Sequence, residues 1–298
     1  MLALIQKLIT VIFLASPGFI SYCFNTELVS SAFFAFASVV STYASVLAAE
    51  FFFSFRLDQK NVFPVKSSTW LRAWFAEVLA GPQIFCWRQP FRTNAEEDFL
   101  FSHALKGHRG VVLVHGLFCN RAFWTPWMRR LRIEGHAFVS LSLEPIFGSI
   151  DSYHEQISAA VAKVFHVTQQ PVLIVCHSMG GLAVRQWLSG TSDTAVVYRV
   201  VTIATPHHGT WLAKFGSSQN AREMKLGSAW LSALDKKAHS KLNQLFTCWY
   251  SDTDNIVFPA KNACLEGADN RLASGLGHVC LAFTPVIVEA TLALLKEP

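Results

Sequence analysis

One short segment in the middle of the chain constrains the fold more than any other. A wholly apolar run over residues 172–176 leads directly into the sequence HSMGG at 177–181, and a helix-like stretch over 182–188 follows at once. This order predicts a buried strand, a sharp turn and a helix. Ser178 stands at the turn, where a strained backbone would project its hydroxyl above the end of a sheet. The segment therefore predicts an α/β fold with Ser178 as a candidate nucleophile.

The residues around Ser178 suit a turn of this kind. The positions two before and two after the serine must be small, because the strand and the helix approach closely there. Gly180 meets this requirement, and Cys176, which is also small, stands where a glycine is usual. Met179 begins the helix, so we expect its N–H to stabilise a developing oxyanion. We expect His177 to lie beside the substrate.

Strand-like and helix-like segments alternate from Gly110 to the C-terminus. The expected strands cover residues 111–114, 137–143, 172–176, 199–204 and 246–250. The expected helices cover residues 123–134, 151–167, 179–188 and 285–295. Such alternation is typical of a mostly parallel central sheet covered by helices. We therefore assign residues 106–298 to one α/β domain.

A second turn follows the first expected strand. His115, Gly116, Leu117 and Phe118 stand directly after residues 111–114. Gly116 would let the backbone approach a substrate closely. We expect the N–H of Leu117, with Phe118 as the second choice, to be the other oxyanion donor. We also expect Phe118 to contact the substrate, and an ordinary turn after a strand is the alternative.

A serine nucleophile needs a base and a carboxylate, and two later segments offer them. In enzymes that present a serine on such a turn, the chain order is serine, carboxylate, histidine. Asp252 and Asp254 follow the strand at 246–250, and His278 is the histidine that comes after them. We expect His278 to accept the serine proton, and Asp254 rather than Asp252 to orient the imidazole. Both aspartates could instead be turn residues.

Five segments together resemble the lipase and esterase branch of the α/β-hydrolase superfamily, especially bacterial triacylglycerol lipases. They cover residues 114–118, 177–181, 205–209, 254–257 and 277–278, and they occur in the family's order. The resemblance implies an α/β-hydrolase fold and hydrolysis of carboxylic esters through an acyl-serine intermediate. It also implies an apolar ester or lipid substrate, with no cofactor and no metal. Cys176 and the apolar N-terminal region depart from the family's pattern.

The stretch between residues 207 and 245 is too long for a simple loop. It is rich in apolar residues, so we expect a cap whose walls contact an acyl chain. We place His207 and Trp211 among the substrate-binding residues. A cap helix without a role in binding is the alternative. For the whole chain, the alternatives to an ester hydrolase are an acyltransferase on the same scaffold and a non-catalytic membrane protein with a hydrolase fold.

Two runs near the N-terminus, over residues 8–26 and 28–49, contain no charged residue. Each reaches the roughly 20 residues that a helix needs to cross a bilayer core. We expect two transmembrane helices within residues 1–55, joined by a tight turn near 25–27. A cleaved signal peptide is the alternative for the first run, and a buried helix of a soluble protein is the alternative for the second.

Loop charges predict how these helices are oriented. Four basic residues lie between positions 56 and 72, whereas no basic residue lies between the two runs. The positive-inside rule therefore predicts a multi-pass protein, in a bacterial inner membrane, with its catalytic domain in the cytoplasm. Residues 56–105 form a connector. Trp70 and Trp74 lie in it at helical spacing, which predicts either an interfacial helix or a helix packed on the catalytic domain.

Composition narrows the remaining classes of partner. Charged residues make up 15% of the chain against about 25% in typical soluble domains, which agrees with contact with lipid. The net charge of +5 is mild, and no cluster of Lys and Arg with interleaved aromatic residues indicates nucleic acid. The seven cysteines are odd in number and form no C-x-x-C pair. They predict neither a disulfide framework nor a zinc site.

Overall fold

Six parallel strands form one sheet in this computed structural model, which describes residues 1–24, 27–58, 65–100, 107–191, 194–237 and 240–297. The order across the sheet is β2-β1-β3-β4-β5-β6, and each neighbouring pair is parallel. The strands are β1 (Val111–Val114), β2 (Phe138–Ser140), β3 (Val172–His177), β4 (Val197–Ile203), β5 (Phe246–Tyr250) and β6 (Asp269–Leu272). The predicted mostly parallel sheet is confirmed.

The five strands predicted from the sequence are present, although β2 is shorter than the expected 137–143. The prediction missed β6. This strand lies at the edge of the sheet, and its sequence DNRL has exposed polar residues in place of an apolar run. Apolar patterning finds strands that are buried on both faces, so an edge strand held by backbone pairing to β5 gives no such signal.

Four helices cover the two faces of the sheet: α5 (Thr125–Ile133), α6 (His154–Thr168), α7 (Met179–Gly190) and α12 (Pro285–Leu294). Further helical segments connect the rest of the domain. These are η3 (Arg121–Trp124), η4 (Ile150–Tyr153), η5 (Trp211–Phe215), α8 (Gln219–Glu223), α9 (Ala229–Lys237), α10 (Ser240–Asn243), η6 (Ala260–Ala263) and α11 (His278–Leu281). The predicted helices agree with α5, α6, α7 and α12 to within a few residues.

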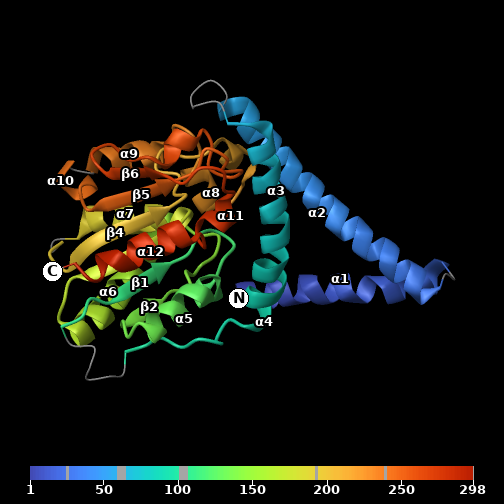
Figure 1. Cartoon of the computed structure of the whole chain (residues 1–298), viewed down its shortest axis with the longest axis horizontal. Coiled ribbons are helices and arrows are strands. Elements are labelled where there is room, and N and C mark those ends of the chain that lie inside the picture. The colour runs from blue at the N-terminus through green and yellow to red at the C-terminus, as the bar shows by residue number, and fades with distance from the viewer. Residues whose placement is uncertain (25–26, 59–64, 101–106, 192–193, 238–239, 298) are drawn as a thin grey trace.

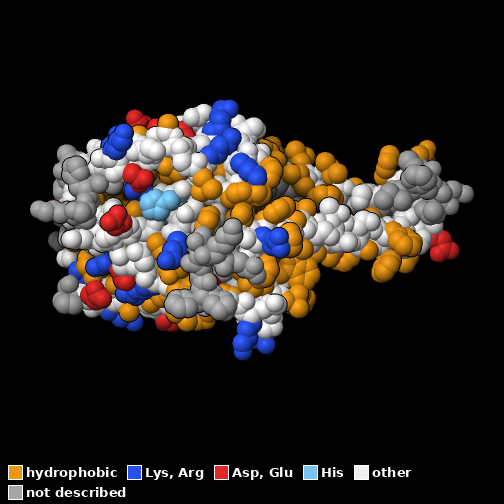
Figure 2. Space-filling view, turned by 90° about the horizontal axis from the view of Figure 1, so that it is seen from above, with side chains coloured by type: hydrophobic (Ala, Val, Ile, Leu, Met, Phe, Trp, Pro, Cys, Tyr) orange, Lys and Arg blue, Asp and Glu red, His pale blue; other side chains and the backbone are white. Residues whose placement is uncertain are grey.

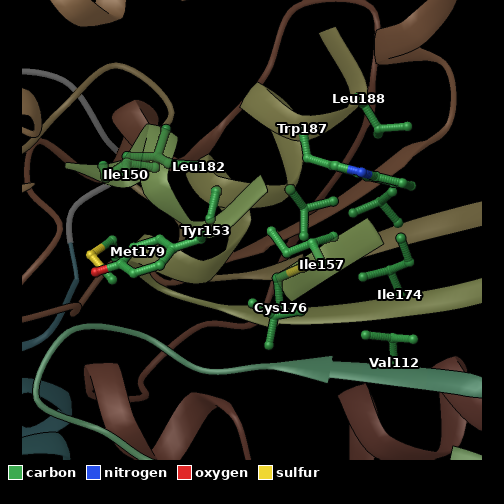
Figure 3. Packing of buried hydrophobic residues seen from close by; sticks show 14 of the residues in the cluster. Val112, Ile150, Tyr153, Ile157, Ile174, Cys176, Met179, Leu182, Trp187 and Leu188 are labelled. Carbon is green, nitrogen blue, oxygen red and sulfur yellow. The ribbon is translucent and has the colours of Figure 1, made fainter. Parts of the chain in front are cut away.

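Successive side chains of β3 point to opposite faces of the sheet and pack in two separate layers of the core. Leu173 and Val175 pack in the cluster that includes buried residues of α5 and α12. Ile174 and Cys176 point to the opposite face and pack in the cluster that includes α6 and α7. Figure 3 shows Cys176 within this second layer, beside Ile157. A strand that is buried on both faces must be apolar throughout, which is why this run is so visible in the sequence.

Three long helices precede the domain: α1 (Leu2–Phe24), α2 (Leu28–Asp58) and α3 (Ser67–Gly81). Two short segments, η1 (Pro82–Arg88) and α4 (Gln89–Phe91), follow α3. Figure 1 shows α1 and α2 extending away from the sheet and meeting at their far ends, while α3 runs along the domain. The two ends nearer the domain are tied to it, since Gln6 of α1 donates to the carbonyl of Phe118 and Ser54 of α2 donates to the carbonyl of Asp254. Residues 25 and 26 of the expected turn lie outside the described residues.

One helix within the described residues, Val29–Asp58, is long and apolar enough to cross a membrane. The first helix contributes a shorter apolar stretch, Leu2–Ser16. Large apolar side chains point outward on both, and Phe33, Phe34 and Phe36 are each about two-thirds exposed. Figure 2 shows hydrophobic side chains along this projecting arm, whereas most charged side chains lie over the globular part. An apolar surface of this extent is typical of a site that contacts a membrane or another protein.

The connector helix α3 has two different faces. Trp74 donates from its indole nitrogen to the carbonyl of Ala44 on α2, and the ring of Trp70 contacts Phe51 of α2. A second stripe of residues at a spacing of four, Leu71, Phe75 and Leu79, is exposed. The helix therefore packs on its neighbours with one face and presents an apolar stripe with the other.

The tryptophan on α5 offers a test of the core. Trp127 is almost fully buried and donates from its indole nitrogen to the carbonyl of Ala282, 2.7 Å away. We expect Trp127→Ala to lower the free energy of unfolding by about 3–5 kcal/mol, because it leaves a cavity. Denaturant titration in detergent measures the change. Ile133→Ala on the exposed side of α5 is the control, with an expected change within about 0.5 kcal/mol.

Candidate active site

Ser178 lies at a strained turn between β3 and α7. Its backbone has φ 54° and ψ −130°, a conformation that a residue with a side chain rarely adopts. The turn is held from the side of β4, because the N–H of Ser178 donates to the carbonyl of Ile203 at 2.9 Å. The hydroxyl of Thr205 donates to the carbonyl of Ser178, also at 2.9 Å. The predicted strand, turn and helix around Ser178 are therefore present.

Two glycines allow the ends of β1 and β3 to approach each other at this turn. A Cβ atom on Gly180 would lie 2.6 Å from the carbonyl oxygens of both Val114 and His115. A Cβ atom on Gly116 would lie 2.7 Å from the Cβ of Ser178. Because neither a carbonyl oxygen nor a Cβ atom can move away cheaply, both positions need glycine. The loop after β1 therefore lies directly against the serine.

His278 and Asp254 form a buried pair. The Nδ1 atom of His278 lies 3.0 Å from both carboxylate oxygens of Asp254. Asp254 is held in turn, since its Oδ1 accepts hydrogen bonds from the backbone N–H groups of Ile256 and Val257 at 2.8 and 2.9 Å. Asp252 instead binds the hydroxyl of Ser274 and the N–H of Gly275. The structure thus brings Asp254, and not Asp252, to the imidazole.

The pKa of His278 reflects two opposing effects. Burial disfavours the imidazolium and lowers the pKa, whereas the negative charge of Asp254, together with Glu77 and Glu50, raises it. The net result is a pKa above the ordinary value of histidine. The imidazolium is therefore stabilised at this position, which suits a group that must accept and hold a proton.

Ser178 and His278 line one cavity of ≈ 420 Å³. Leu117 and Phe118 also line it, so the loop after β1 reaches the same space. Apolar side chains form most of the remaining wall, among them Leu47, Phe85, Leu212, Ala213, Met224 and Ile256. Leu47 belongs to α2, so a helix from the N-terminal region contributes to the wall. Within the described ranges, no three His, Cys, Asp or Glu side chains converge in a way that could hold a metal ion.

Of the four expected substrate-binding residues, Phe118 lines the cavity and the other three lie elsewhere. His177 is buried, stacks on the ring of Phe123 at 4.6 Å, and has its Nε2 3.1 Å from the carbonyl of His278. His207 is fully buried beside Thr202 and Cys248. Burial holds the pKa of both histidines well below the ordinary value, so both are neutral.

Trp211 occupies the junction between η5 and α2. Its ring lies 5.2 Å from that of Phe53 on α2 and 5.8 Å from that of Phe258. The neighbouring residues Leu212 and Ala213, rather than Trp211, face the cavity. Met179, the other expected oxyanion donor, is buried at the first position of α7 with its backbone next to Ser178.

Sequence reasoning missed the contribution of α2 and α3 to this site. Glu50 of α2 accepts a hydrogen bond from the amide of Asn255 at 2.7 Å, one residue after Asp254. The hydroxyl of Ser54 donates to the carbonyl of Asp254 at 2.6 Å. Glu77 of α3 lines the cavity with Glu50. Glu50 stands in an otherwise apolar part of α2, and Glu77 is the one acidic residue of α3; these were the available signals.

Comparisons with known proteins agree with this geometry. The sequence profile described as "Alpha/beta hydrolase family" matches residues 111–290. The structure is similar to a lipase of Bacillus licheniformis in mature form (TM-score 0.57, 17% identity, covering 63% of this chain and 92% of that one). It is also similar to lipase B of Aspergillus fumigatus (TM-score 0.58, 18% identity, covering 66% and 54%). No curated protein matches the sequence. The predicted α/β-hydrolase fold is thus confirmed.

Because Asp254 contacts His278, we expect the pKa of His278 to depend on the charge of Asp254. Asp254→Asn removes the nearest negative charge, so we expect the pKa of His278 to fall. NMR titration of protein with isotopically labelled histidine measures the shift. Asp252→Asn removes an equal charge that contacts Ser274 and Gly275, and we expect it to leave the pKa of His278 close to its starting value. Equal shifts in the two variants would contradict the assignment.

Proposed function

Since this chain belongs to the alpha/beta hydrolase family, we propose that it hydrolyses carboxylic esters with Ser178 as nucleophile, His278 as base and Asp254 as the orienting carboxylate. The observation that carries the proposal is the pairing of His278 with Asp254 at 3.0 Å beside the strained turn of Ser178, with serine and histidine lining one cavity. A strained serine, a paired imidazole and an apolar cavity together suit acyl transfer.

The reaction proceeds in two halves. The Oγ of Ser178 attacks the ester carbonyl while its proton passes to His278, and a tetrahedral intermediate forms. The bond to the leaving oxygen then breaks, and His278 returns the proton to that oxygen, which leaves an acyl-serine and an alcohol. Water repeats the sequence and releases the carboxylic acid. Asp254 stays hydrogen-bonded to Nδ1 and stabilises the imidazolium, which agrees with the raised pKa of His278.

Two backbone N–H groups are the proposed oxyanion donors. Met179 is the first residue of α7, and an N–H at a helix start has no intrahelical acceptor. Leu117 lines the cavity in the loop that Gly116 brings against Ser178. Phe118, with φ 58°, turns the backbone directly after Leu117. These features support an oxyanion hole made of Met179 and Leu117.

The cavity favours an apolar acyl group. Its wall combines η5 and α8 from the expected cap at 207–245 with Leu47 of α2 and Phe118. Burial of a hydrocarbon chain contributes about 0.8 kcal/mol for each methylene group, so such a wall selects substrates by chain length. We assign Phe118 to substrate binding. His177, His207 and Trp211 support the neighbouring loops through the contacts described above.

The N-terminal helices are the proposed membrane anchor. The exposed apolar surface of α1 and α2 supports insertion into a bilayer, and the two domain-side ends of the pair support entry and exit on one side of it. We keep the division into residues 1–55, 56–105 and 106–298. The excess of basic residues after α2 supports a catalytic domain in the cytoplasm of a bacterium, at its inner membrane.

Covalent labelling tests the nucleophile. We expect a fluorophosphonate probe to label the purified full-length protein and to leave Ser178→Ala unlabelled. Removal of the nucleophile should lower kcat for ester hydrolysis on the order of 10⁴- to 10⁶-fold, because both halves of the reaction need it. A panel of esters with graded acyl chains then measures chain-length preference. Labelling that persists in Ser178→Ala would place the reactive group elsewhere.

Protease protection tests the orientation. In sealed right-side-out vesicles, we expect added protease to leave the domain at 106–298 intact, and to digest it once the membrane is permeabilised. Immunoblotting of a C-terminal tag follows the fragment. Digestion in the intact vesicles would place the domain on the outer side, and recovery of the protein in the soluble fraction after an alkaline wash would contradict the anchor.

A further inference from the structure

His278 begins the short helix α11, whose first backbone N–H groups are capped by distant side chains. The N–H of His278 donates to the amide oxygen of Asn255 at 3.1 Å. The N–H groups of Val279 and Cys280 both donate to one carboxylate oxygen of Glu77, at 2.8 and 2.7 Å. Helix starts leave such groups without intrahelical acceptors, so these contacts determine where α11 begins. The position of the imidazole depends on the same contacts.

Glu77 is an unusual partner for this helix. It lies on α3, about 200 residues earlier in the chain and outside the region that matches the family. The residue is 2% exposed, and burial raises the pKa of its carboxyl group. The hydrogen bond from the backbone N–H of Cys280 lowers this pKa and so opposes the effect of burial. A buried carboxylate is costly unless hydrogen bonds satisfy it. The two N–H groups of α11 supply those bonds, so α3 and α11 hold each other in place.

Gly277, the residue before His278, lies directly against the Glu77 carboxylate. A Cβ atom on Gly277 would lie 2.2 Å from the Cγ of Glu77 and 2.5 Å from its Oε1. The backbone of Gly277 has φ −75°, which any residue can adopt. Glycine is therefore needed here for space and not for conformational freedom. The absence of a side chain at Gly277 leaves the space that the Glu77 side chain occupies.

The carboxylate is also fixed from its own side. The hydroxyl of Tyr43 on α2 donates to the backbone carbonyl of Glu77 at 3.1 Å. Glu50 of α2 holds Asn255, and Asn255 holds the N–H of His278. Both caps of α11 are thus connected to the pair α2 and α3. Figure 1 shows α11 at the side of the domain that faces α3.

We propose that Glu77 is the positioning residue for His278, so that α3 completes the active site of the family domain. The proposal rests on the proposed function, because it gives Glu77 its effect through the base of that reaction. Asp254 fixes the imidazole through Nδ1, and Glu77 fixes the backbone that carries the imidazole. A displacement of about 1 Å in a catalytic group can cost about 100-fold in rate. Loss of Glu77 therefore reduces turnover without removing any reacting atom.

The first test compares Glu77→Ala with Glu77→Gln in the full-length protein. Titration with fluorophosphonate counts competent sites, so kcat is expressed per site and an unfolded fraction does not contribute. We expect Glu77→Ala to lower this kcat by about 10- to 100-fold, with a much smaller change in KM. Glu77→Gln should restore most of it, because the amide oxygen still accepts both hydrogen bonds. Leu79→Ala, on the exposed face of α3, is the control and should match the unaltered protein.

The second test is a double-mutant cycle with Gly277→Ala. Alone, this change pushes the Glu77 side chain away from α11, so we expect a loss of kcat similar to that of Glu77→Ala. In the double variant the methyl group occupies vacated space, so the loss should be no greater than that of Glu77→Ala alone. If the two changes acted independently, their fold losses in kcat would multiply in the double variant.

Two results would overturn the proposal: a wild-type kcat per titrated site in Glu77→Ala, or multiplying losses in the cycle. Failure of the proposed function gives a different result, since the unaltered protein itself would then take no label at Ser178. The labelling experiment is therefore carried out first on the unaltered protein.

Discussion

The close approach of β1 and β3 at their C-terminal ends is the constraint on which the site depends. The loop after β1 and the turn at Ser178 share a space that admits no side chain at Gly116 or Gly180. That contact brings Leu117 and Ser178 to one cavity, and Ser178 has φ 54° at the sharp turn from β3 into α7. Hydrogen bonds from Thr205 and to Ile203 compensate the strain of the turn. Larger residues at either glycine would separate the proposed oxyanion donors from the nucleophile.

Buried carboxylates connect this site to the N-terminal helices. Glu50 lies in an apolar part of α2 and Glu77 is the one acidic residue of α3, and an unpaired buried carboxylate would be unfavourable at either position. Their partners are Asn255, which follows Asp254 in the chain, and the backbone of α11, which begins with His278. Helix α2, which is part of the proposed membrane anchor, therefore also supports the catalytic domain, together with α3. Their packing on the domain connects the proposed anchor to the geometry of the imidazole.

Much of the fold could be predicted because buried parallel strands must be apolar on both faces. The runs that became β1, β3 and β5 were visible for that reason, and so was the turn that carries Ser178. The edge strand β6 was missed because backbone pairing and not apolar burial holds it. Among the binding residues, Phe118 lines the cavity, whereas His177 and His207 are buried in packing. A histidine next to a catalytic residue in sequence need not face the same space.

Local order along the chain was enough to determine the strand, turn and helix around Ser178, the glycines beside it and the apolar character of the first two helices. These properties depend on residue size and hydrophobicity within a few positions. The order of segments along the chain favoured Asp254 over Asp252 as the partner of His278, and their packing forms the contact. Tertiary structure alone decided that Glu77 caps the helix that carries this histidine. Both contacts join residues that are distant in sequence. Their geometry depends on how the helices pack against the sheet, and patterns within a few residues of the sequence do not predict that packing.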